Sequence, residues 1–444
     1  MAVLQRMNDL LWGPWTLALL LGTGLFLNLR MHFLPWRRLG FALRSALGKE
    51  ARRSGKDGVS PFSALMTTLA ATIGTGNIVG VSTALVAGGP GALLWMEVSA
   101  LLGMSTMFAE CMLSVKYRRR DARGRWHGGP MYMMEAAFGR RTGRIAGSLF
   151  ALFAVGASFG IGSMTQANAI TDALDSTFGL PGFPVGLVIS LLSLAAILGG
   201  IRSISRLTSV LVPVMSVFYL AAGLAVIFGH IENLLPGVLS LFRCAFSPEA
   251  VAGGLAGAAL RWGVARGVFS NEAGLGSTGI AAAAADTDDP VRQGYISMTG
   301  AFFDTIVICT VTGLAICCSG VLGTVDAGGS PVDGAALTLL AFETILGPLG
   351  SRFLAVSIVL FAFSTILGWE YQGEQAFFYL FRRRGVGVYR LLYALSVLLG
   401  ATARLETVYL FSDVCNALMC MPNLVCVLTL SGEAVAGIRN AERL

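Results

Sequence analysis

Two stretches of the chain interrupt long apolar segments in the same way, and they decide the fold. Residues 69–80 read LAATIGTGNIVG, and residues 266–277 read RGVFSNEAGLGS. Each stretch puts glycine, asparagine and hydroxyl residues in the middle of a segment that is otherwise apolar. A glycine weakens a helix by about 1 kcal/mol relative to alanine, so several together favour an unwound backbone. The two stretches therefore predict two broken helices.

The composition indicates a protein built mostly from membrane-spanning segments. Of 444 residues, 55% belong to the set AVILMFWYC and 13% are charged, and the mean hydropathy is +0.71. Soluble domains average about 25% charged residues, so this chain has too few polar groups to cover a soluble globule. The composition also excludes a disordered chain and a small disulfide scaffold. With eight cysteines mostly in apolar runs, three histidines and no HExxH or CxxC motif, we expect neither a disulfide framework nor a zinc site.

Eleven apolar segments are long enough to cross a bilayer of ~30 Å, which takes about 20 residues. They lie near residues 10–30, 62–87, 90–116, 145–174, 183–200, 207–230, 250–285, 294–322, 336–372, 388–403 and 406–431. The sequence therefore predicts an all-α polytopic membrane protein with about 11 transmembrane helices.

The loops between these segments indicate an orientation. Loops 31–61, 117–144 and 381–390 carry seven, eight and four basic residues, whereas the alternate loops carry only Arg243 and Arg404. Loops rich in Lys and Arg stay in the cytoplasm, so we expect the N-terminus outside and the C-terminus in the cytoplasm. The net charge of +7 then indicates contact between the cytoplasmic loops and anionic lipids, with no nucleic-acid partner.

The two broken segments are the second and the seventh, five apart in the chain. Irregular backbone at membrane depth is tolerated where it lines a cavity, and paired breaks point to the binding site of a transporter. We expect an accessory helix and basic loop at 1–61, a first five-helix repeat at 62–230, an external connector at 231–249, a second, inverted repeat at 250–431 and a cytoplasmic tail at 432–444. GxxxG spacing also serves helix packing, and we expect that role for Gly80 and Gly257.

Five motifs resemble those of the alanine/glycine:cation symporter family of bacteria and archaea, which belongs to the amino acid-polyamine-organocation superfamily. They are GTGNIVG at 74–80, GGPGA at 88–92, GGPMY at 128–132, VARGVFSNEAGLG at 264–276 and FAFSTILGW at 361–369. The resemblance covers roughly residues 55–430. One departure is Ser277–Ala282, which reads STGIAA where relatives usually have a Ser-Ala-Pro-Ile-Ala-His run. The resemblance implies the leucine-transporter-like fold and sodium- or proton-driven uptake of small neutral amino acids through the plasma (inner) membrane of a prokaryote.

An amino acid of this kind needs two partners of opposite charge in a dry site. Its carboxylate suits backbone N–H groups at a half-helix N-terminus, where the dipole is positive, so the amides of Thr75 and Gly76, next to Asn77, are the candidates. Its ammonium suits carbonyl groups released by the breaks, those of Thr72, Phe269 and Ser270.

The other residues around the site determine which substrate side chain fits. Gln166 lies mid-span and either hydrogen-bonds the substrate or is a satisfied packing residue, while Asn271 is the better polar candidate. Phe269 and Trp369 are large enough to cap a small pocket, with ordinary core packing as the alternative for each. A pocket closed by Trp369 would favour alanine or glycine, although pocket size discriminates by only ~1–3 kcal/mol per methylene.

Sodium is the expected coupling ion, and no organic cofactor is expected. A hard cation prefers several oxygen ligands. The family resemblance implies an ion between two helices, held by the carbonyls of Ala70 and Ile73 and the hydroxyls of Ser364 and Thr365. The competing interpretation is that these hydroxyls bond carbonyls of their own helix. Asn77 is the candidate ligand of a second sodium.

Three acids, Asp304, Glu97 and Glu110, fall within apolar spans, where acids are functional candidates by default. They either carry protons or form structural ion pairs with Arg261 or Arg266. Glu272 lies inside the second break, and we expect it to anchor the unwound backbone by accepting its N–H groups.

Other classes of function have less support. An intramembrane enzyme would need a nucleophile–base pair or a metal cluster, and no GxSxG motif is present; a primary pump would need GxxxxGK[ST], which is also absent. A channel remains as an alternative use of two broken helices. Within the transporters, the sequence leaves open glutamine or D-amino acids as substrates and protons as the coupling ion.

Overall fold

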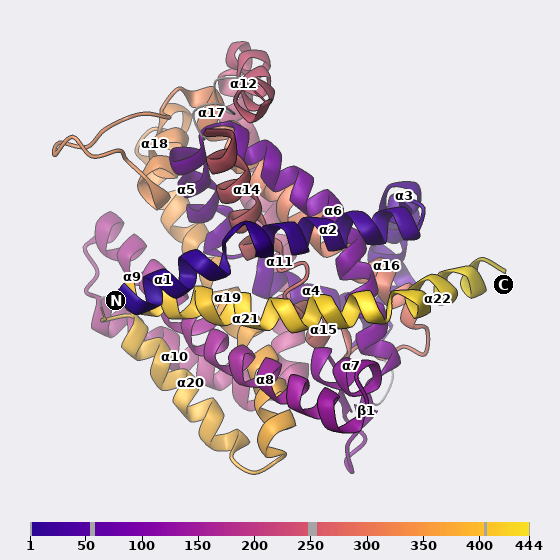
Figure 1. Cartoon of the computed structure of the whole chain (residues 1–444). Helices are drawn as coiled ribbons and strands as arrows, with labels where there is room; N and C mark the ends of the chain where they lie inside the picture. The colour runs from indigo at the N-terminus through magenta and orange to yellow at the C-terminus, as the bar shows by residue number, and fades with distance from the viewer. Residues whose placement is uncertain (1, 54–57, 247–254, 404–405, 444) are drawn as a thin grey trace.

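The chain folds into a bundle of helices of very different lengths (Figure 1). The structure is a computed structural model, and it describes residues 2–53, 58–246, 255–403 and 406–443. Within these residues, seven helical stretches are long and apolar enough to cross a membrane. They are Val3–Arg30, Gly91–Lys116, Arg140–Phe178, Gly200–Gly229, Pro290–Ser319, Leu349–Phe381 and Thr407–Thr429.

The first half of the described chain runs from α1 to α12. Its helices are α1 (Ala2–Leu11), α2 (Pro14–Arg30), α3 (Leu34–Leu47), α4 (Pro61–Thr72), α5 (Val79–Gly88), α6 (Gly91–Lys116), α7 (Pro130–Ala137), α8 (Arg140–Phe159), α9 (Thr165–Phe178), α10 (Gly182–Leu198), α11 (Gly200–Gly229) and α12 (Leu234–Phe246). Shorter elements join them: the 3-10 turns η1 (Lys49–Arg52), η2 (Thr75–Asn77) and η4 (Ile231–Asn233), the π-helical turn η3 (Gly160–Met164), and the strands β1 (Arg119–Arg120) and β2 (Trp126–His127).

The second half runs from α14 to α22. Its helices are α14 (Leu255–Asn271), α15 (Ser277–Ala282), α16 (Pro290–Ala301), α17 (Thr310–Ser319), α18 (Gly334–Leu346), α19 (Leu349–Phe381), α20 (Val386–Gly400), α21 (Glu406–Thr429) and α22 (Ser431–Arg443), with the π-helical turn η5 (Phe302–Cys309) between α16 and α17.

Most expected spans coincide with helices, but the ninth does not. The segment 336–372 was expected as one span, and the structure divides it between the short α18 and the long α19. Gly347, with φ of 55°, ends α18, and Pro348 precedes the first residue of α19. A positive φ favours glycine and ends a helix, so a run of uniform hydropathy contains a sharp turn.

Loops that hydropathy treats as connectors contain helices of their own. The basic loop 31–61 forms α3 and η1, the loop 117–144 contains the strands and α7, and the connector 231–249 contains η4 and α12. Residues 247–249 of that connector and residues 250–254, at the expected start of the second repeat, lie outside the described residues. In Figure 1, α3 and α22 lie on the right of the bundle, and α12, α17 and α18 lie at its top.

Two long helices form the centre of the bundle. Helix α6 packs against α2, α14 and α16, and α19 packs against α4, α8, α9 and α11. Within the described part of the chain, a Cβ added at Gly80 or Gly257 would have no neighbour within 4 Å, so the described residues give no close helix contact for the packing role expected of either glycine. The close approach lies elsewhere: a Cβ at Gly368 of α19 would be 2.6 Å from the backbone nitrogen of Ala71 in α4.

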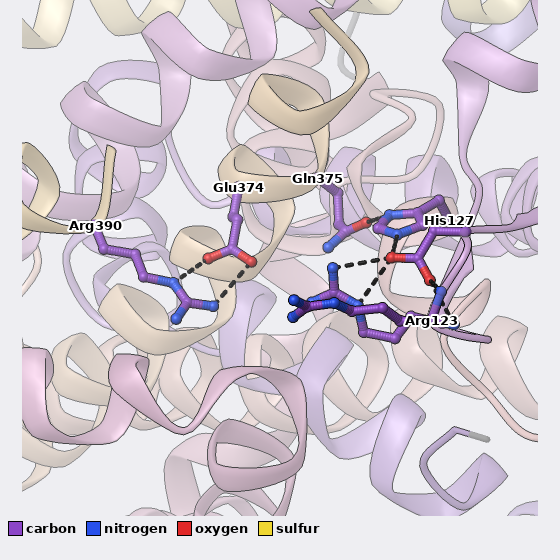
Figure 2. A network of polar contacts seen from close by, with 7 residues as sticks. Arg123, His127, Glu374, Gln375 and Arg390 are labelled. Carbon is purple, nitrogen blue, oxygen red and sulfur yellow. Dashed lines mark hydrogen bonds and ion pairs between the residues drawn. The ribbon is translucent and has the colours of Figure 1, made fainter. Parts of the chain in front are cut away.

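The hairpin β1–β2 is tied to α19 by buried polar contacts. Figure 2 shows His127 beside Gln375, and the His127 Nδ1 lies 2.6 Å from the Gln375 Oε1. The other ring nitrogen is 3.3 Å from Asp121, and the ring stacks on Phe378 with centroids 4.0 Å apart. A separate ion pair in the same view joins Glu374 of α19 to Arg390 of α20 at 2.5 Å.

Asp121 holds the turn of this hairpin together. Its side chain accepts hydrogen bonds from the backbone amides of Arg123 and Arg125, each at 2.9 Å, and pairs with the Arg125 guanidinium at 2.9 Å. Burial opposes the charge of Asp121, but these hydrogen bonds outweigh it and hold the pKa of the carboxyl well below its usual range. The loop is therefore built around an ionised Asp121.

Candidate functional site

The first predicted break is confirmed at the backbone level. Helix α4 ends at Thr72, Gly74 is extended, and η2 forms a single turn before α5 begins at Val79. The Asn77 side chain is fully buried, and its Oδ1 accepts the backbone N–H of Gly74 at 2.9 Å. The N–H groups that open a helical turn have no partner within it, so those of Thr75 and Gly76 are available to an acceptor.

The second predicted break is confirmed as well. Helix α14 ends at Asn271, and α15 begins at Ser277. Glu272 has a φ of 58°, a left-handed conformation that is unusual for a residue with a side chain. The last carbonyl groups of a helix have no intrahelical partner, so those of Phe269 and Ser270 lie at the break without a partner inside α14.

The expectation for Glu272 is wrong in its detail. The Glu272 carboxylate accepts the hydroxyl of Ser277 at 2.5 Å and so spans the break from one side to the other. Two backbone N–H groups within the break have other acceptors: that of Ala273 donates to the Asn271 Oδ1 at 2.9 Å, and that of Leu275 donates to the Glu272 carbonyl at 3.0 Å. The shorter Asn271 side chain folds back on its own turn, as asparagine commonly does, and this leaves Glu272 to reach the start of α15.

The two breaks meet at a single carboxylate, that of Asp304 in η5. Its Oδ1 accepts from the Asn77 Nδ2 at 2.8 Å, and its Oδ2 accepts from the Ser270 hydroxyl at 2.8 Å. The hydroxyl of Thr305 donates to the same Oδ2 at 2.8 Å and accepts from the Asn271 amide at 3.1 Å. Asp304 is fully buried, so side chains from both breaks are held by one buried acid.

The ion-pair alternative for the intramembrane acids finds no support in the described part of the chain. Arg261 pairs with Asp9 at 3.3 Å, and Arg266 lies over the rings of Trp262 and Phe269. Glu110 is fully buried and accepts hydrogen bonds from Thr278 at 2.9 Å and from Asn423 at 3.1 Å. The Asn423 amide also donates to the carbonyl of Gly274 at 3.0 Å, inside the second break.

A cavity of about 790 Å³ leads to the breaks from the side of α1 and α21. It reaches Thr75, Gly76 and Phe269, and Arg266 and Asp413 lie along its wall. A Cβ at Gly76 would be 3.5 Å from the Phe269 ring and 3.5 Å from the Ser270 Cα. The two breaks are therefore nearly in contact at the inner end of this cavity.

The structure brings some of the expected wall residues together and leaves others apart. The Thr75 hydroxyl donates to the Gln166 Oε1 at 3.3 Å, and the Gln166 amide donates to the carbonyl of Ile161 at 2.9 Å in η3. Trp369 is 1% exposed and does not line the cavity. It packs on the π-helical turn, where a Cβ at Gly162 would be 2.3 Å from the Trp369 Cβ.

The expected sodium ligands lie across the contact between α4 and α19. The Ser364 hydroxyl is 3.4 Å from the Ala70 carbonyl, and the Thr365 hydroxyl is 3.5 Å from the Ile73 carbonyl. Both hydroxyls also bond the Phe361 carbonyl of their own helix, at 2.8 and 3.1 Å. Each hydroxyl therefore lies near one carbonyl across the contact, where Gly368 allows α19 to approach α4 closely.

The hub formed by Asp304 was not found from the sequence. Asp304 was singled out as an intramembrane acid, but its partners are Asn77 and Ser270, which lie 227 and 34 positions away along the chain. The only sequence signal for this hub is an acidic residue in the middle of an apolar span. That signal does not indicate which neighbouring helix the side chain faces.

Comparisons with known proteins agree with this fold. The family model described as the sodium:alanine symporter family matches residues 1–443. The chain is 46% identical to the sodium/alanine symporter AgcS of Methanococcus maripaludis, over 98% of this chain and 96% of that one. It is 37% identical to the probable sodium/glutamine symporter GlnT of Bacillus subtilis, over 98% and 89% of the two chains.

Solved structures support the same architecture. The crystal structure of MhsT in complex with L-phenylalanine matches with a TM-score of 0.55 at 16% identity, covering 85% of this chain and 90% of that one. Mhp1, a nucleobase-cation-symport-1 family transporter, matches with a TM-score of 0.52 at 15% identity, covering 89% and 96%. The fold is thus the leucine-transporter-like fold, and the protein is a multi-pass membrane transporter of amino acids, not an enzyme. The chain belongs to the sodium:alanine symporter family.

Proposed function

We propose that this protein takes up small neutral amino acids, alanine and glycine, together with sodium by alternating access. The observation that carries the proposal is the meeting of the two breaks at the inner end of a cavity that reaches Thr75, Gly76 and Phe269. A zwitterion needs N–H groups and carbonyl groups a few ångströms apart, and two facing breaks supply both.

In the proposed complex, the substrate carboxylate accepts the N–H groups of Thr75 and Gly76. The ammonium donates to the carbonyls of Thr72, Phe269 and Ser270. Gln166 supports Thr75 through their 3.3 Å hydrogen bond, and Asn271 keeps the second break in place through Thr305. The Phe269 ring covers the site from the cavity, and Trp369 limits its depth from behind η3. The small gap at Gly76 favours substrates with a hydrogen or methyl side chain.

Sodium is the proposed coupling ion. The first ion is bound by the carbonyls of Ala70 and Ile73 and the hydroxyls of Ser364 and Thr365. Across the helix contact, the Ser364 hydroxyl lies 3.4 Å from the Ala70 carbonyl and the Thr365 hydroxyl lies 3.5 Å from the Ile73 carbonyl. A second sodium is bound beside Asn77, where the Asp304 carboxylate supplies a negative charge. A hard cation suits both oxygen sets.

The proposal includes a topology. Residues 62–230 and 250–431 form the two inverted repeats, preceded by the accessory segment 1–61, joined by the connector 231–249 and followed by the tail 432–444. The N-terminus lies outside and the C-terminus in the cytoplasm of a prokaryotic cell. The basic loops then face the anionic lipids of the inner leaflet.

Uptake by purified protein in proteoliposomes tests the proposal. Labelled L-alanine is offered under an inward sodium gradient or an equal potassium gradient, each with and without a pH gradient. We expect accumulation that needs sodium and is competed by glycine. Gly76→Val, which fills the gap beside Phe269, should abolish it, whereas Gly22→Val in α2, where a Cβ meets nothing within 4 Å, should not.

Other outcomes would replace parts of the proposal. Accumulation driven by the pH gradient alone would reject sodium coupling and would make the buried Asp304 the candidate proton carrier. Glutamine uptake in the absence of alanine uptake would reject the small-substrate assignment; one relative at 37% identity is named a probable sodium/glutamine symporter. Downhill flux without saturation or coupling to any gradient would indicate a channel.

A further inference from the structure

A groove lined by basic residues lies where α3 and η1 meet the start of α16. Its volume is about 770 Å³, and four basic side chains and two aromatic rings line it: Arg38, Arg44, Lys49, Arg292, Phe41 and Tyr295. This groove, called the basic groove below, is separate from the cavity that reaches the helix breaks, because the two share no lining residue.

The charges of the basic groove do not balance. Two acids, Glu50 and Asp289, face its four cations. Glu50 pairs with the Arg292 guanidinium at 2.6 Å, and Asp289 caps α16 by accepting the Arg292 backbone N–H at 3.0 Å. Both acids are therefore engaged at Arg292. Among the described residues that line the groove, cations exceed acids by two. This excess attracts an anion.

Helix α3 has the surface of a helix that lies at a membrane interface. Its inner face buries Leu34 and Ala42. Trp36, on the outer face, is 55% exposed, and Phe41, at the edge beside α16, is 48% exposed. Exposed Trp and Phe next to Arg and Lys are typical of helices that lie in the headgroup region. In a chain that spans a membrane, this outer face contacts lipid, so the bilayer reaches the rim of the basic groove.

Phe41 joins the two parts of this surface. It lines the basic groove, it is half exposed, and its ring packs edge-on against Tyr295 of α16 with centroids 5.1 Å apart. A molecule in the basic groove therefore meets guanidinium and ammonium groups inside and an aromatic surface at the rim. A guanidinium group can donate two parallel hydrogen bonds to the oxygens of one phosphate. An aromatic ring that is half exposed at a membrane interface borders the acyl chains of the lipid.

We propose that the basic groove binds the phosphate headgroup of an anionic phospholipid, with the acyl chains leaving past Phe41 along the outer face of α3. Bulk attraction of basic loops to anionic lipid needs no groove; this proposal assigns one headgroup to named residues. It goes beyond the proposed function, and the binding measurement below does not depend on transport.

The position of the headgroup gives it a structural consequence. Helix α3 and η1 precede α4, the first broken helix, and α16 continues into η5, which carries Asp304. The basic groove lies across this junction, which the ion pair between Glu50 and Arg292 already bridges. A bound phosphate adds a second bridge, because it contacts Arg44 and Lys49 on one side and Arg292 on the other. It should therefore raise the thermal stability of the transporter.

Native mass spectrometry of the full-length, delipidated protein tests the proposal. Phosphatidylglycerol is added at increasing concentration, with phosphatidylcholine in a parallel series. We expect one phosphatidylglycerol to bind before the weaker sites fill, and the double variant Arg44→Gln/Lys49→Gln to weaken that step about 30-fold, at about fivefold per charge. The matched control is Arg383→Gln/Arg384→Gln, which removes the same charge from an exposed turn after α19 and should leave the first step unchanged.

Three results would overturn the proposal. Equal weakening in the groove variant and in the turn variant would mean nonspecific attraction. Equal retention of phosphatidylcholine and phosphatidylglycerol would mean that no anion is recognised. Thermal stabilisation by inorganic phosphate to the same extent as by phosphatidylglycerol would identify a free anion in place of a lipid. The single variant Lys49→Gln, with an expected fivefold weakening, repeats the test if the double variant does not fold.

Discussion

Replacing Thr365 by valine removes one oxygen from the proposed sodium site and keeps the shape of the side chain. The Thr365 hydroxyl and the Ile73 carbonyl are 3.5 Å apart. Hard cations of this size bind oxygen at about 2.4 Å, so one ion can contact both atoms with an angle of about 94° between them. The 3.4 Å between Ser364 and Ala70 gives about 90° in the same way. Both angles suit a six-coordinate ion.

The size of the effect follows from the loss of one ligand. An interaction between a polar group and a charge contributes about 1.5–3 kcal/mol, and each 1.4 kcal/mol is a factor of about ten. Thr365→Val should therefore raise the sodium concentration for half-maximal alanine uptake by about 10- to 100-fold. The measurement is initial uptake into proteoliposomes over a range of external sodium at constant ionic strength.

A matched control separates ion binding from packing. Thr68 in α4 is also fully buried, and its hydroxyl donates at 3.2 Å to Ala64 of the same helix. Thr68→Val makes the same chemical change away from the proposed ion and should leave the sodium dependence within about twofold of the wild type, well short of the tenfold step that a lost ligand gives. If Thr365→Val behaves like Thr68→Val, the Thr365 hydroxyl serves only the Phe361 carbonyl of its own helix, and the ion-site assignment is refuted.

Three further predictions concern other parts of the molecule. Asp304→Asn keeps the shape of the buried side chain but removes the charge that the Asn77 amide faces. With the protein still folded, uptake should fall at least tenfold, which corresponds to about 1.4 kcal/mol. Near-normal uptake would contradict a role for that charge. Gly368→Ala places a methyl group against Ala71, and thermal unfolding should show a loss of about 1–3 kcal/mol. Backbone amides in the turn around Asp121 should be protected from hydrogen exchange above the ordinary carboxyl pKa of about 4. They should lose this protection as the pH falls through the lower pKa that Asp121 has in the folded protein. The variant Asp121→Asn should lack this pH dependence.

The hydropathy pattern predicted most of the helices because a membrane span is a local property of about 20 residues. It failed where a break depends on two residues, as at Gly347 and Pro348 between α18 and α19. It also failed for α3 and α12, because these helices have 14 and 13 residues and a search for spans of about 20 residues counts such segments as connectors. The two breaks were predictable because several glycines occur together with an asparagine at mid-span, and helix packing alone does not need the asparagine.

Contacts between distant segments were beyond the sequence. Asp304 was identified as a candidate acid, but the choice between an arginine partner and a polar hub depends on which face of its helix points inward. The π-helical turn η5 includes Asp304, and such turns often occur at functional sites. One extra residue in a turn rotates every later side chain, and a pattern with a period of 3.6 residues does not reveal it.

The position of Gly74 suggests how sodium and substrate influence each other without touching. A Cβ on Gly74 would be 2.5 Å from the Thr365 hydroxyl, so the bare backbone lies against the proposed sodium site. The Gly74 N–H donates to Asn77, and Asn77 donates to Asp304, which also accepts from Ser270 in the other break. A cation beside Thr365 that draws in the Ile73 carbonyl therefore acts on the peptide that holds this chain of hydrogen bonds. We therefore predict that the ion biases both breaks through this continuous physical contact.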